Sequence, residues 1–191
     1  MPILKYEPDI FPESLLAEGD GVVTAPAVCS DAQWWAVYTM SRQEKLLMRK
    51  LYAKQIPFYS PLVERRFRSP NGRARTTFDP LFHNYVFLFA NEAQRYATLQ
   101  TNCVSRCLEV PDASDLVRDL RRIQQLVASG AALTPETKLQ VGDRVRVKSG
   151  PLKGVEGVVM RRENEVRLLV AVQYLQRGAS VVLSDNSFEA I

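Results

Sequence analysis

Long apolar runs and a secretion signal are both missing from this chain of 191 residues. A helix needs about 18 consecutive apolar residues to span a bilayer, and no stretch of the sequence reaches that length. The first 20 residues carry acids such as Glu7 and Asp9 where a secretion signal needs basic residues followed by an apolar stretch. We therefore expect a cytoplasmic protein that does not contact a membrane.

Cysteine and histidine are also scarce, with three cysteines and one histidine in the whole chain. The sparse, odd set of Cys29, Cys103 and Cys107 argues against a disulfide framework. Together with His83 these cysteines do not supply the four ligands of a zinc site, and nothing around them marks an activated nucleophile. The glycines over 149–157 lie among predicted strands and not before a helix, so no phosphate-binding loop is expected. These absences predict a protein that is not an enzyme and holds no metal or cofactor.

Charge, in contrast, is plentiful and unevenly distributed along the chain. Residues 1–33 carry one basic side chain against six acids, a net charge of −5, whereas residues 34–80 carry ten against three, a net charge of +7. Clustered Lys and Arg attract the phosphates of nucleic acids over long distances. The contrast predicts a polyanion-binding surface in the first folded domain. A solvated charged face is the simpler alternative.

Changes of composition divide the chain into four predicted parts. The first part has several prolines and no periodicity, so it is expected to be flexible. A short stretch without periodicity separates two folded regions of different character. The predicted parts are an acidic extension over 1–32, an N-terminal domain over 33–130, a linker over 131–138 and a C-terminal domain over 139–191.

A strand and a helix open the N-terminal domain. Residues 34–40, WWAVYTM, are aromatic and β-branched and predict a buried strand. Ser41 and Glu44 have the spacing of a capping box, which predicts a helix over about 42–55. The apolar stripe of this helix consists of Leu47, Met48 and Leu51.

Four more strands and two helices follow. The β-like runs over 57–68 and 74–82 flank an Asn-Gly pair, which is a strong hairpin signal. Strands are also predicted over 84–89 and 103–110, with a short helix over 91–100 between them. The stripe of a longer second helix consists of Leu116, Leu120, Ile123 and Val127. Interleaved strands and helices predict an α+β sandwich, with helices packed on an antiparallel sheet.

The C-terminal domain is predicted to be a small β-barrel, because RVRVK alternates strictly and short β-branched runs are separated by glycines. Val145 and Val147 should point inward. The region resembles a KOW motif, whose barrel is SH3-like. The matching residues are Gly142-Asp143, Gly150-Pro151, Gly154 and Gly157. KOW barrels also occur in ribosomal proteins, so an RNA-binding ribosomal protein remains an alternative at this point.

The N-terminal domain carries a more specific resemblance. Residues 34–45, WWAVYTMSRQEK, resemble the opening of the NGN domain of the NusG family, and residues 79–89, DPLFHNYVFLF, resemble its second signature. The phrase PLFHNYVF is nearer to the specialised paralogues typified by RfaH than to the housekeeping type, which usually has Pro-Gly in place of His83-Asn84. The resemblance implies a transcription elongation factor without catalytic activity.

The resemblance also implies a surface for RNA polymerase. In the family, the NGN domain binds the clamp helices of the largest polymerase subunit through an apolar, aromatic depression and reaches the gate-loop region. By position, Tyr38, Tyr85 and Phe87 are the candidates for the clamp-helix contact. Tyr85 and Phe87 share one face of a strand, so they are expected to act together. Ordinary core packing of these rings is the alternative.

Nucleic-acid contacts are implied at two places. Specialised family members touch the exposed non-template DNA strand from the start of the first helix, where basic groups would attract phosphates and Gln or Arg could read an unstacked base. The candidates there are Ser41, Arg42, Gln43, Lys45, Arg49 and Lys50. An Arg-rich hairpin, expected to reach upstream DNA or polymerase, adds Arg65, Arg66, Arg68, Arg73 and Arg75. A solvated hairpin is the alternative.

The barrel of this family recruits the termination factor Rho or the ribosomal protein NusE through the loop after its third strand. Here that loop holds Leu175, Gln176 and Arg177, where the common pattern is Phe-Gly-Arg. We expect a monomer that binds polymerase and suppresses pausing and termination as an operon-specific antiterminator. A housekeeping factor that acts with Rho is the main alternative.

Overall fold

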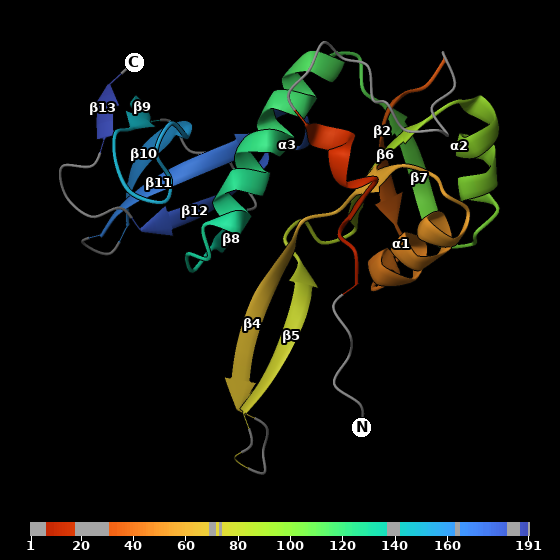
Figure 1. The fold of residues 1–191 in the computed structure, drawn as a ribbon, viewed down its shortest axis with the longest axis horizontal. Helices are drawn as coiled ribbons and strands as arrows, with labels where there is room; N and C mark the ends of the chain where they lie inside the picture. Colours follow the sequence, from red (N-terminus) through yellow and green to blue (C-terminus); the bar gives the residue numbers. More distant parts are fainter. Residues whose placement is uncertain are drawn as a thin grey trace. The chain divides into compact units, whose positions relative to one another are not determined.

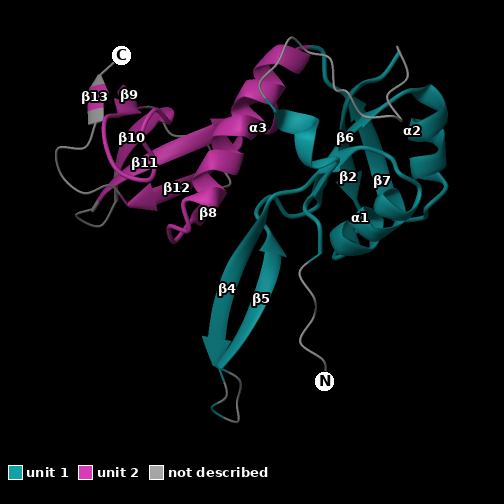
Figure 2. Ribbon diagram, viewed as in Figure 1, with its two compact units in different colours: residues 1–111 teal, residues 112–191 magenta. Residues whose placement is uncertain are grey.

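The chain forms two compact units, residues 1–111 and 112–191, in the part that its structure describes (Figures 1 and 2). The structure is a computed structural model. It describes residues 7–17, 31–68, 72, 74–136, 142–162, 165–182 and 188–190. Among these residues, no helix combines the length and the apolar character needed to cross a membrane.

The first unit is built on a five-stranded antiparallel sheet with the strand order β1-β3-β6-β2-β7. In sheet order these strands are β1 (Ile10–Phe11), β3 (Phe58–Tyr59), β6 (Tyr85–Ala90), β2 (Gln33–Thr39) and β7 (Val104–Glu109). The helices of this unit are α1 (Glu44–Ala53) and α2 (Glu92–Leu99). The prediction of an α+β domain with helices on an antiparallel sheet is confirmed.

Alternate residues of the central strands face the helices and form the core. Trp35 and Val37 from β2 pack in one buried cluster with the predicted stripe of α1. Val86 and Leu88 from β6 belong to the same cluster. The predicted stripe, Leu47, Met48 and Leu51, is fully buried. The other face of the sheet carries the remaining residues of each strand, among them the candidate tyrosines.

The start of α1 differs from the predicted capping box. Ser41 does not cap the helix, which begins at Glu44, with Gln43 as an N-cap that makes no side-chain hydrogen bond. The buried Glu44 carboxylate instead accepts the backbone N–H of Asn84, at 2.7 Å. The reason is the left-handed backbone of Arg42 (φ 61°), which turns the chain before the helix can start.

The predicted flexible extension is ordered in part, because residues 7–17 belong to the first unit. Ile10 and Phe11 form β1 and pair with Tyr59 and Phe58 of β3. A 3-10 helix, η1 (Glu13–Leu16), follows, and its two leucines are buried. A two-residue strand has no detectable periodicity, so its pairing could not be read from the sequence. The rest of the extension, 1–6 and 18–30, lies outside the described residues.

A two-stranded hairpin leaves the sheet between β3 and β6. Its strands, β4 (Leu62–Arg68) and β5 (Ala74–Pro80), project away from the rest of their unit (Figure 1). The register pairs Leu62 with Pro80 at the base and Arg68 with Ala74 at the far end. The predicted hairpin is therefore confirmed, although the run over 57–68 divides into β3 and β4.

The second unit contains a six-stranded antiparallel sheet with the order β13-β9-β10-β11-β12-β8. In chain order its elements are α3 (Ala113–Ala128), β8 (Thr134–Glu136), β9 (Arg144–Val147), β10 (Glu156–Arg162), β11 (Glu165–Val172), η2 (Gln173–Leu175), β12 (Arg177–Val182) and β13 (Phe188–Ala190). Val145 and Val147 are buried, and the intervening Arg146 is exposed, as the alternation predicts.

Two glycines show why this sheet needs residues without a side chain. A Cβ on Gly157 would lie 2.5 Å from the carbonyl oxygen of Leu169, so only glycine permits this approach of β10 to β11. Gly150 stands in open space but has a φ of +84°, which other residues rarely adopt. Close approach of the backbone and a positive φ are thus two separate reasons for glycine in this sheet.

The helix α3 contacts the barrel in this structure. It lies along β11 and η2, and the division into units falls at Pro111 and Asp112. Part of the predicted linker forms β8, which pairs with β12. A three-residue strand containing Pro135 carries no local signal, because its pairing depends on the barrel around it. The predicted boundaries at 130 and 139 stay a prediction.

Candidate functional site

Two tyrosines and two neighbours from β7 lie together on the sheet face opposite the α1 core. Tyr38 of β2 pairs with Tyr85 of β6 on one side and with Arg106 of β7 on the other. The two tyrosine rings meet edge to face, with their centroids 5.1 Å apart. Leu108 lies on the same face and is 41% exposed. We call Tyr38, Tyr85, Arg106 and Leu108 the tyrosine patch.

The turn before β6 holds this patch in place. Asn84 has a left-handed backbone (φ 66°), its carbonyl oxygen accepts the Thr39 N–H at 2.8 Å, and its own N–H donates to Glu44. The Asn84 side-chain amide also lies 3.5 Å from the Tyr38 hydroxyl. Asparagine and glycine both tolerate this conformation. The Asn84 of this chain therefore preserves the turn that glycine would form, and it does not by itself mark a specialised subtype.

Phe87 differs from Tyr85 in its burial. It is 0% exposed and packs edge to face against Phe82, with the ring centroids 6.3 Å apart. Tyr85 is half-buried and keeps an exposed rim. That Phe87 and Tyr85 act together stays a prediction, and in this structure Phe87 takes part in core packing. The two side chains share a face, on which Tyr85 is half-buried and Leu108 is exposed.

The sequence contained a signal for the two β7 residues that the prediction missed. Cys107 packs against the core cluster of the opposite face, so its neighbours Arg106 and Leu108 must point toward Tyr38. An exposed leucine beside an arginine on this face was visible from that alternation. The sequence alone does not give the register of β7 with β2, which places Arg106 opposite Tyr38.

The turn between β2 and α1 exposes the first group of predicted nucleic-acid residues. Met40 is 49% exposed, and Ser41 and Arg42 are exposed beside it. Gln43 is half-buried, and its side-chain oxygen lies 3.9 Å from the Cys103 sulfur. Lys45, half-buried on the first turn of α1, forms no ion pair with any described residue, and neither does Arg42.

Arg49 and Lys50 have intramolecular partners instead. Arg49 pairs with Glu7 at 2.5 Å, and the hydrogen bond to that carboxylate raises the pKa of the guanidinium above its usual value. Lys50 donates to the carbonyl oxygen of Thr101 at 2.8 Å. These two side chains tie α1 to the N-terminal segment and to the loop before β7, so they are less available for phosphates than Arg42 and Lys45.

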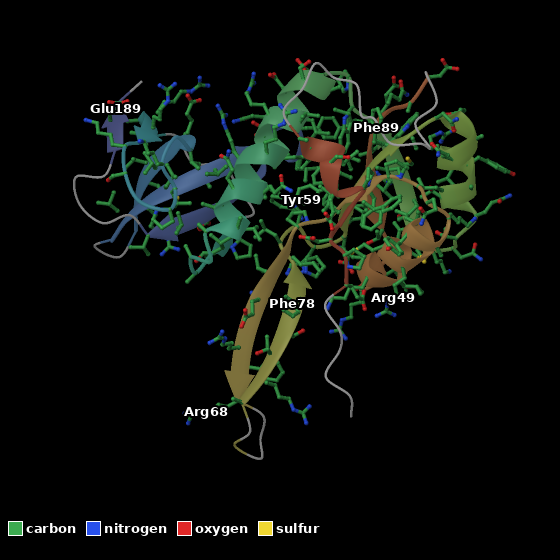
Figure 3. All side chains as sticks on the ribbon, viewed as in Figure 1. Arg49, Tyr59, Arg68, Phe78, Phe89 and Glu189 are labelled. Carbon is green, nitrogen blue, oxygen red and sulfur yellow. The ribbon has the colours of Figure 1, made fainter. Side chains whose placement is uncertain are left out.

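The arginines of the hairpin divide between its two faces. The alternation of β4 and β5 places Arg65 and Arg75 on one face and Arg66 and Arg68 on the other. Arg66 is paired with Glu64 at 2.5 Å, and Arg65 lies 3.9 Å from Asp79. Arg68 and Arg75 form no ion pair within the described part of the chain. Figure 3 shows Arg68 at the far end of the hairpin. The remaining candidate, Arg73, lies outside the described residues.

The predicted partner loop of the barrel follows β11 and contacts α3. Leu175 and Arg177 are half-buried, and Gln176 is exposed with a left-handed backbone (φ 53°). Gln176 thus adopts the conformation for which the common Phe-Gly-Arg pattern provides a glycine. The loop begins at Gln173, whose N–H donates to the Asp119 carboxylate of α3 at 2.9 Å. Burial raises the pKa of the Asp119 carboxyl.

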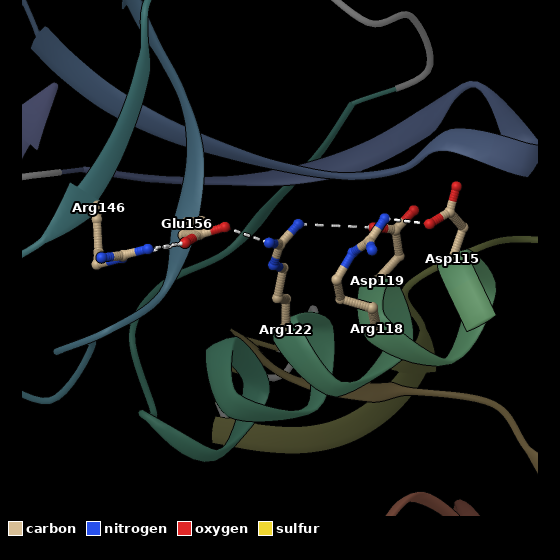
Figure 4. Close-up of polar contacts among 6 residues, drawn as sticks. All are labelled: Asp115, Arg118, Asp119, Arg122, Arg146 and Glu156. Atoms are coloured by element: carbon tan, nitrogen blue, oxygen red, sulfur yellow. Dashed lines mark hydrogen bonds and ion pairs between the residues drawn. The ribbon is translucent and has the colours of Figure 1, made fainter. Parts of the chain in front are cut away.

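A chain of ion pairs joins the same helix to the barrel strands (Figure 4). Glu156 of β10 binds Arg146 of β9 at 2.5 Å and also pairs with Arg122 of α3. Hydrogen bonding to Arg146, with the positive charges of Arg122 and Arg146 nearby, lowers the pKa of the Glu156 carboxyl. These contacts hold α3 beside the predicted partner loop.

The two cysteines in the described part of the chain, Cys103 and Cys107, lie in or against the core. Cys103 is buried in the core cluster, and desolvation raises the pKa of the half-buried Cys107 thiol. A raised pKa keeps a thiol protonated and therefore weakly nucleophilic. Among the described residues, no group of His, Cys, Asp and Glu side chains could hold a metal ion.

Comparisons with known proteins identify a family and a motif in this chain. The family described as "Transcription termination factor nusG" matches residues 32–141, and the KOW motif matches residues 141–171. Among solved structures, a chain from "Crystal Structure of MjSpt4:Spt5 complex conformation B" is 19% identical, covering 83% of this chain and 97% of that chain, with a TM-score of 0.27. A search of curated proteins found no match.

Proposed function

This chain belongs to the NusG family of transcription elongation factors, which bind RNA polymerase and catalyse no reaction, and we propose that its tyrosine patch contacts the clamp helices of the polymerase. The supporting observation is that the aromatic face is partly exposed at the tyrosine patch. Tyr38 and Tyr85 present aromatic rings with polar tips, and Leu108 adds exposed apolar area. Such amphipathic anchors suit the groove between two helices.

The turn over 40–43 and Lys45 would then lie next to the exposed non-template strand of the transcription bubble. Arg42 and Lys45 have no competing ion pair among the described residues, which leaves both charges for phosphates. Gln43 could donate to or accept from an unstacked base. Binding at the clamp together with contact to the bubble would favour the elongating state over the opened or paused state to the extent that the two contacts together are stronger in the elongating state.

The barrel would supply the second partner. NusE and Rho are the two candidates for the loop of Leu175, Gln176 and Arg177, and the left-handed Gln176 preserves the loop shape in the absence of the usual glycine. The missing aromatic anchor at Leu175 argues for a partner surface different from the one that Phe-Gly-Arg loops bind. An operon-specific antiterminator is the subtype we favour, and a housekeeping factor that acts with Rho is the second candidate.

A pull-down with the tagged protein tests the polymerase contact. We expect Tyr85→Ala and Leu108→Ala each to weaken polymerase capture by roughly tenfold or more, since buried aromatic and apolar anchors of interfaces cost about 1–2 kcal/mol or more on truncation. Tyr96→Ala is the matched control, because Tyr96 of α2 is 62% exposed and lies outside the patch. Equal losses for Tyr96→Ala and Tyr85→Ala would remove the patch from the interface.

Chromatin occupancy mapping with the same tag separates the two subtypes. An antiterminator of particular operons should occupy a few long transcription units, whereas a housekeeping factor should follow polymerase across all transcribed genes. Genome-wide occupancy would refute the specialist subtype and leave the family unaffected.

A further inference from the structure

Phe67 is a large apolar side chain in the least protected part of the first unit. It is 49% exposed and lies near the far end of β4, where residues 64–68 and 74–76 are exposed on both faces of the hairpin. Isolated two-stranded hairpins are marginally stable, and the outer half of this one has no layer packed against it. An aromatic ring here does not contribute to a core, so its position calls for another explanation.

The strand register places a guanidinium on two sides of this ring. Arg75 of β5 is directly opposite Phe67, and Arg65 precedes Phe67 by two residues on the same face. Opposed residues have Cβ atoms about 4.5–5.5 Å apart, and alternate residues of a strand are about 7 Å apart. The face thus carries one aromatic ring between two cations. On the other face, Phe78 packs against the core cluster at the base of the hairpin, as its position in Figure 3 illustrates.

The ring and both guanidinium groups are available to a ligand. In the described part of the chain, Phe67 has no aromatic partner, and the cation–π contact there joins Arg95 to Trp35. Arg75 has no ion pair among the same residues, and Arg65 lies a loose 3.9 Å from Asp79, with its side chain 58% exposed. Among the described contacts, binding through these groups would therefore weaken only the ion pair between Arg65 and Asp79.

We propose that this face of the hairpin binds single-stranded nucleic acid, with Phe67 stacking on an unpaired base while Arg65 and Arg75 hold the adjoining phosphates. An aromatic ring between basic groups is the arrangement by which proteins bind single strands without sequence preference. Bases inside a duplex are already stacked and cannot offer a free face to Phe67. Phenylalanine has no hydrogen-bonding group, so the contact is independent of base identity. The inference rests on the nucleic-acid contact expected of the hairpin from the sequence and assigns its ligand class.

Binding of fluorescently labelled oligothymidine of about 12 nucleotides to the full-length protein tests this assignment, with a blunt duplex of equal length as the second probe. We expect Phe67→Ala to weaken single-strand binding by about fivefold to 100-fold, as alanine substitution of a stacking aromatic does. Phe67→Leu should weaken it similarly, because it keeps the apolar volume and loses the π-face. Phe67→Trp should preserve binding, and quenching of the introduced indole by the oligonucleotide would report stacking directly.

Three controls make the outcome decisive. Tyr96→Ala removes an aromatic side chain on α2 that is even more exposed than Phe67 and should leave the affinity unchanged. Circular dichroism of each variant checks that the domain is folded. Polymerase capture by Phe67→Ala should equal that of the wild type, so failure of this inference is distinguishable from failure of the polymerase contact.

Two results would overturn the proposal. Equal affinity for duplex and single strand, with no effect of Phe67→Leu, would mean that the arginines bind phosphates alone. Loss of polymerase capture by Phe67→Ala, with single-strand binding unchanged, would mean that the hairpin docks on a protein surface.

Discussion

At the scale of single residues, Glu44 has a different role from the one its spacing suggested. The Ser-x-x-Glu pattern of residues 41–44 is that of a capping box, but the carboxylate accepts the N–H of Asn84, forty residues further along the chain. Glu44 thereby joins the turn that carries Arg42 to the turn that orients Tyr38 and Tyr85. One buried carboxylate connects the two proposed contact regions of the first unit.

This role predicts a stability effect. Glu44→Ala should lower the free energy of unfolding by about 1–3 kcal/mol, because a buried N–H loses its charged acceptor. Urea unfolding followed by tryptophan fluorescence would measure the change, since Trp34 and Trp35 lie in the adjacent strand. Lys45→Ala is the neighbouring control and should cost less than about 0.5 kcal/mol. Similar costs for the two variants would show that the hydrogen bond to Asn84 contributes little.

At the scale of elements, the ion pairs around Glu156 connect α3 with β9 and β10 (Figure 4). The pKa of Glu156 is lowered in the folded protein, so its contribution to stability is present above the ordinary carboxyl pKa of 4.5. As the pH falls below that value and through the folded pKa, the carboxylate is protonated and the contribution is lost. Removal of the Glu156 charge should therefore lower the free energy of unfolding at neutral pH and leave it unchanged in acid.

The free energy of unfolding of Glu156→Gln, compared with that of the wild type at neutral and at acid pH, tests this pH dependence. Near pH 7 the variant should be less stable than the wild type by about 0.5–1.5 kcal/mol, the sum expected for two partly exposed ion pairs. As the pH falls below 4.5 and through the lowered pKa of the folded protein, the difference should shrink and then disappear. Glu189→Gln is the control, since Glu189 forms a single, more exposed pair with Lys148 at 3.6 Å. If Glu156→Gln remained less stable than the wild type in acid, Glu156 would stabilise the protein through packing and not through its charge.

Elements with strong local patterns were predictable from the sequence, and those made by distant partners were not. The aromatic strand β2, the stripe of α1 and the Asn-Gly hairpin have clear periodicity and turn chemistry. The strands β1 and β8 are two and three residues long and exist because β3 and β12 lie beside them. In the candidate site, Tyr38 and Tyr85 were found from the family signature, whereas Arg106 and Leu108 required the register of β7 with β2.

At the scale of the whole molecule, the family match and the structure assign α3 to different parts of the chain. The family match over 32–141 includes it in the N-terminal domain, whereas its contacts in this structure are with β11 and η2 of the barrel. The helix carries Asp119 and Arg122, whose partners Gln173 and Glu156 are both in the barrel. These contacts place α3 against the loop that we propose for NusE or Rho.

Thermal unfolding of two fragments measures this association. The fragment 112–191 should melt at least about 5 °C above the fragment 131–191, because about 1 kcal/mol raises the Tm of a domain of this size by roughly 4–8 °C. Asp119→Ala and Arg122→Ala within the longer fragment should remove part of the gain. Identical melting temperatures would indicate that α3 does not stabilise the C-terminal fragment. They would support the predicted domain boundary at residue 130.

The short strand β1 has a consequence for the solubility of the protein. An uncovered strand edge displays free N–H and C=O groups on which another chain can assemble, and β3 would present such an edge, with Phe58 and Tyr59 on it, without β1. The strand that covers it is two residues long, ends at Phe11 and is followed by Pro12, which has no N–H to offer. A segment that was expected to be flexible thus covers one edge of the sheet, and this cover should hinder assembly of another chain on β3.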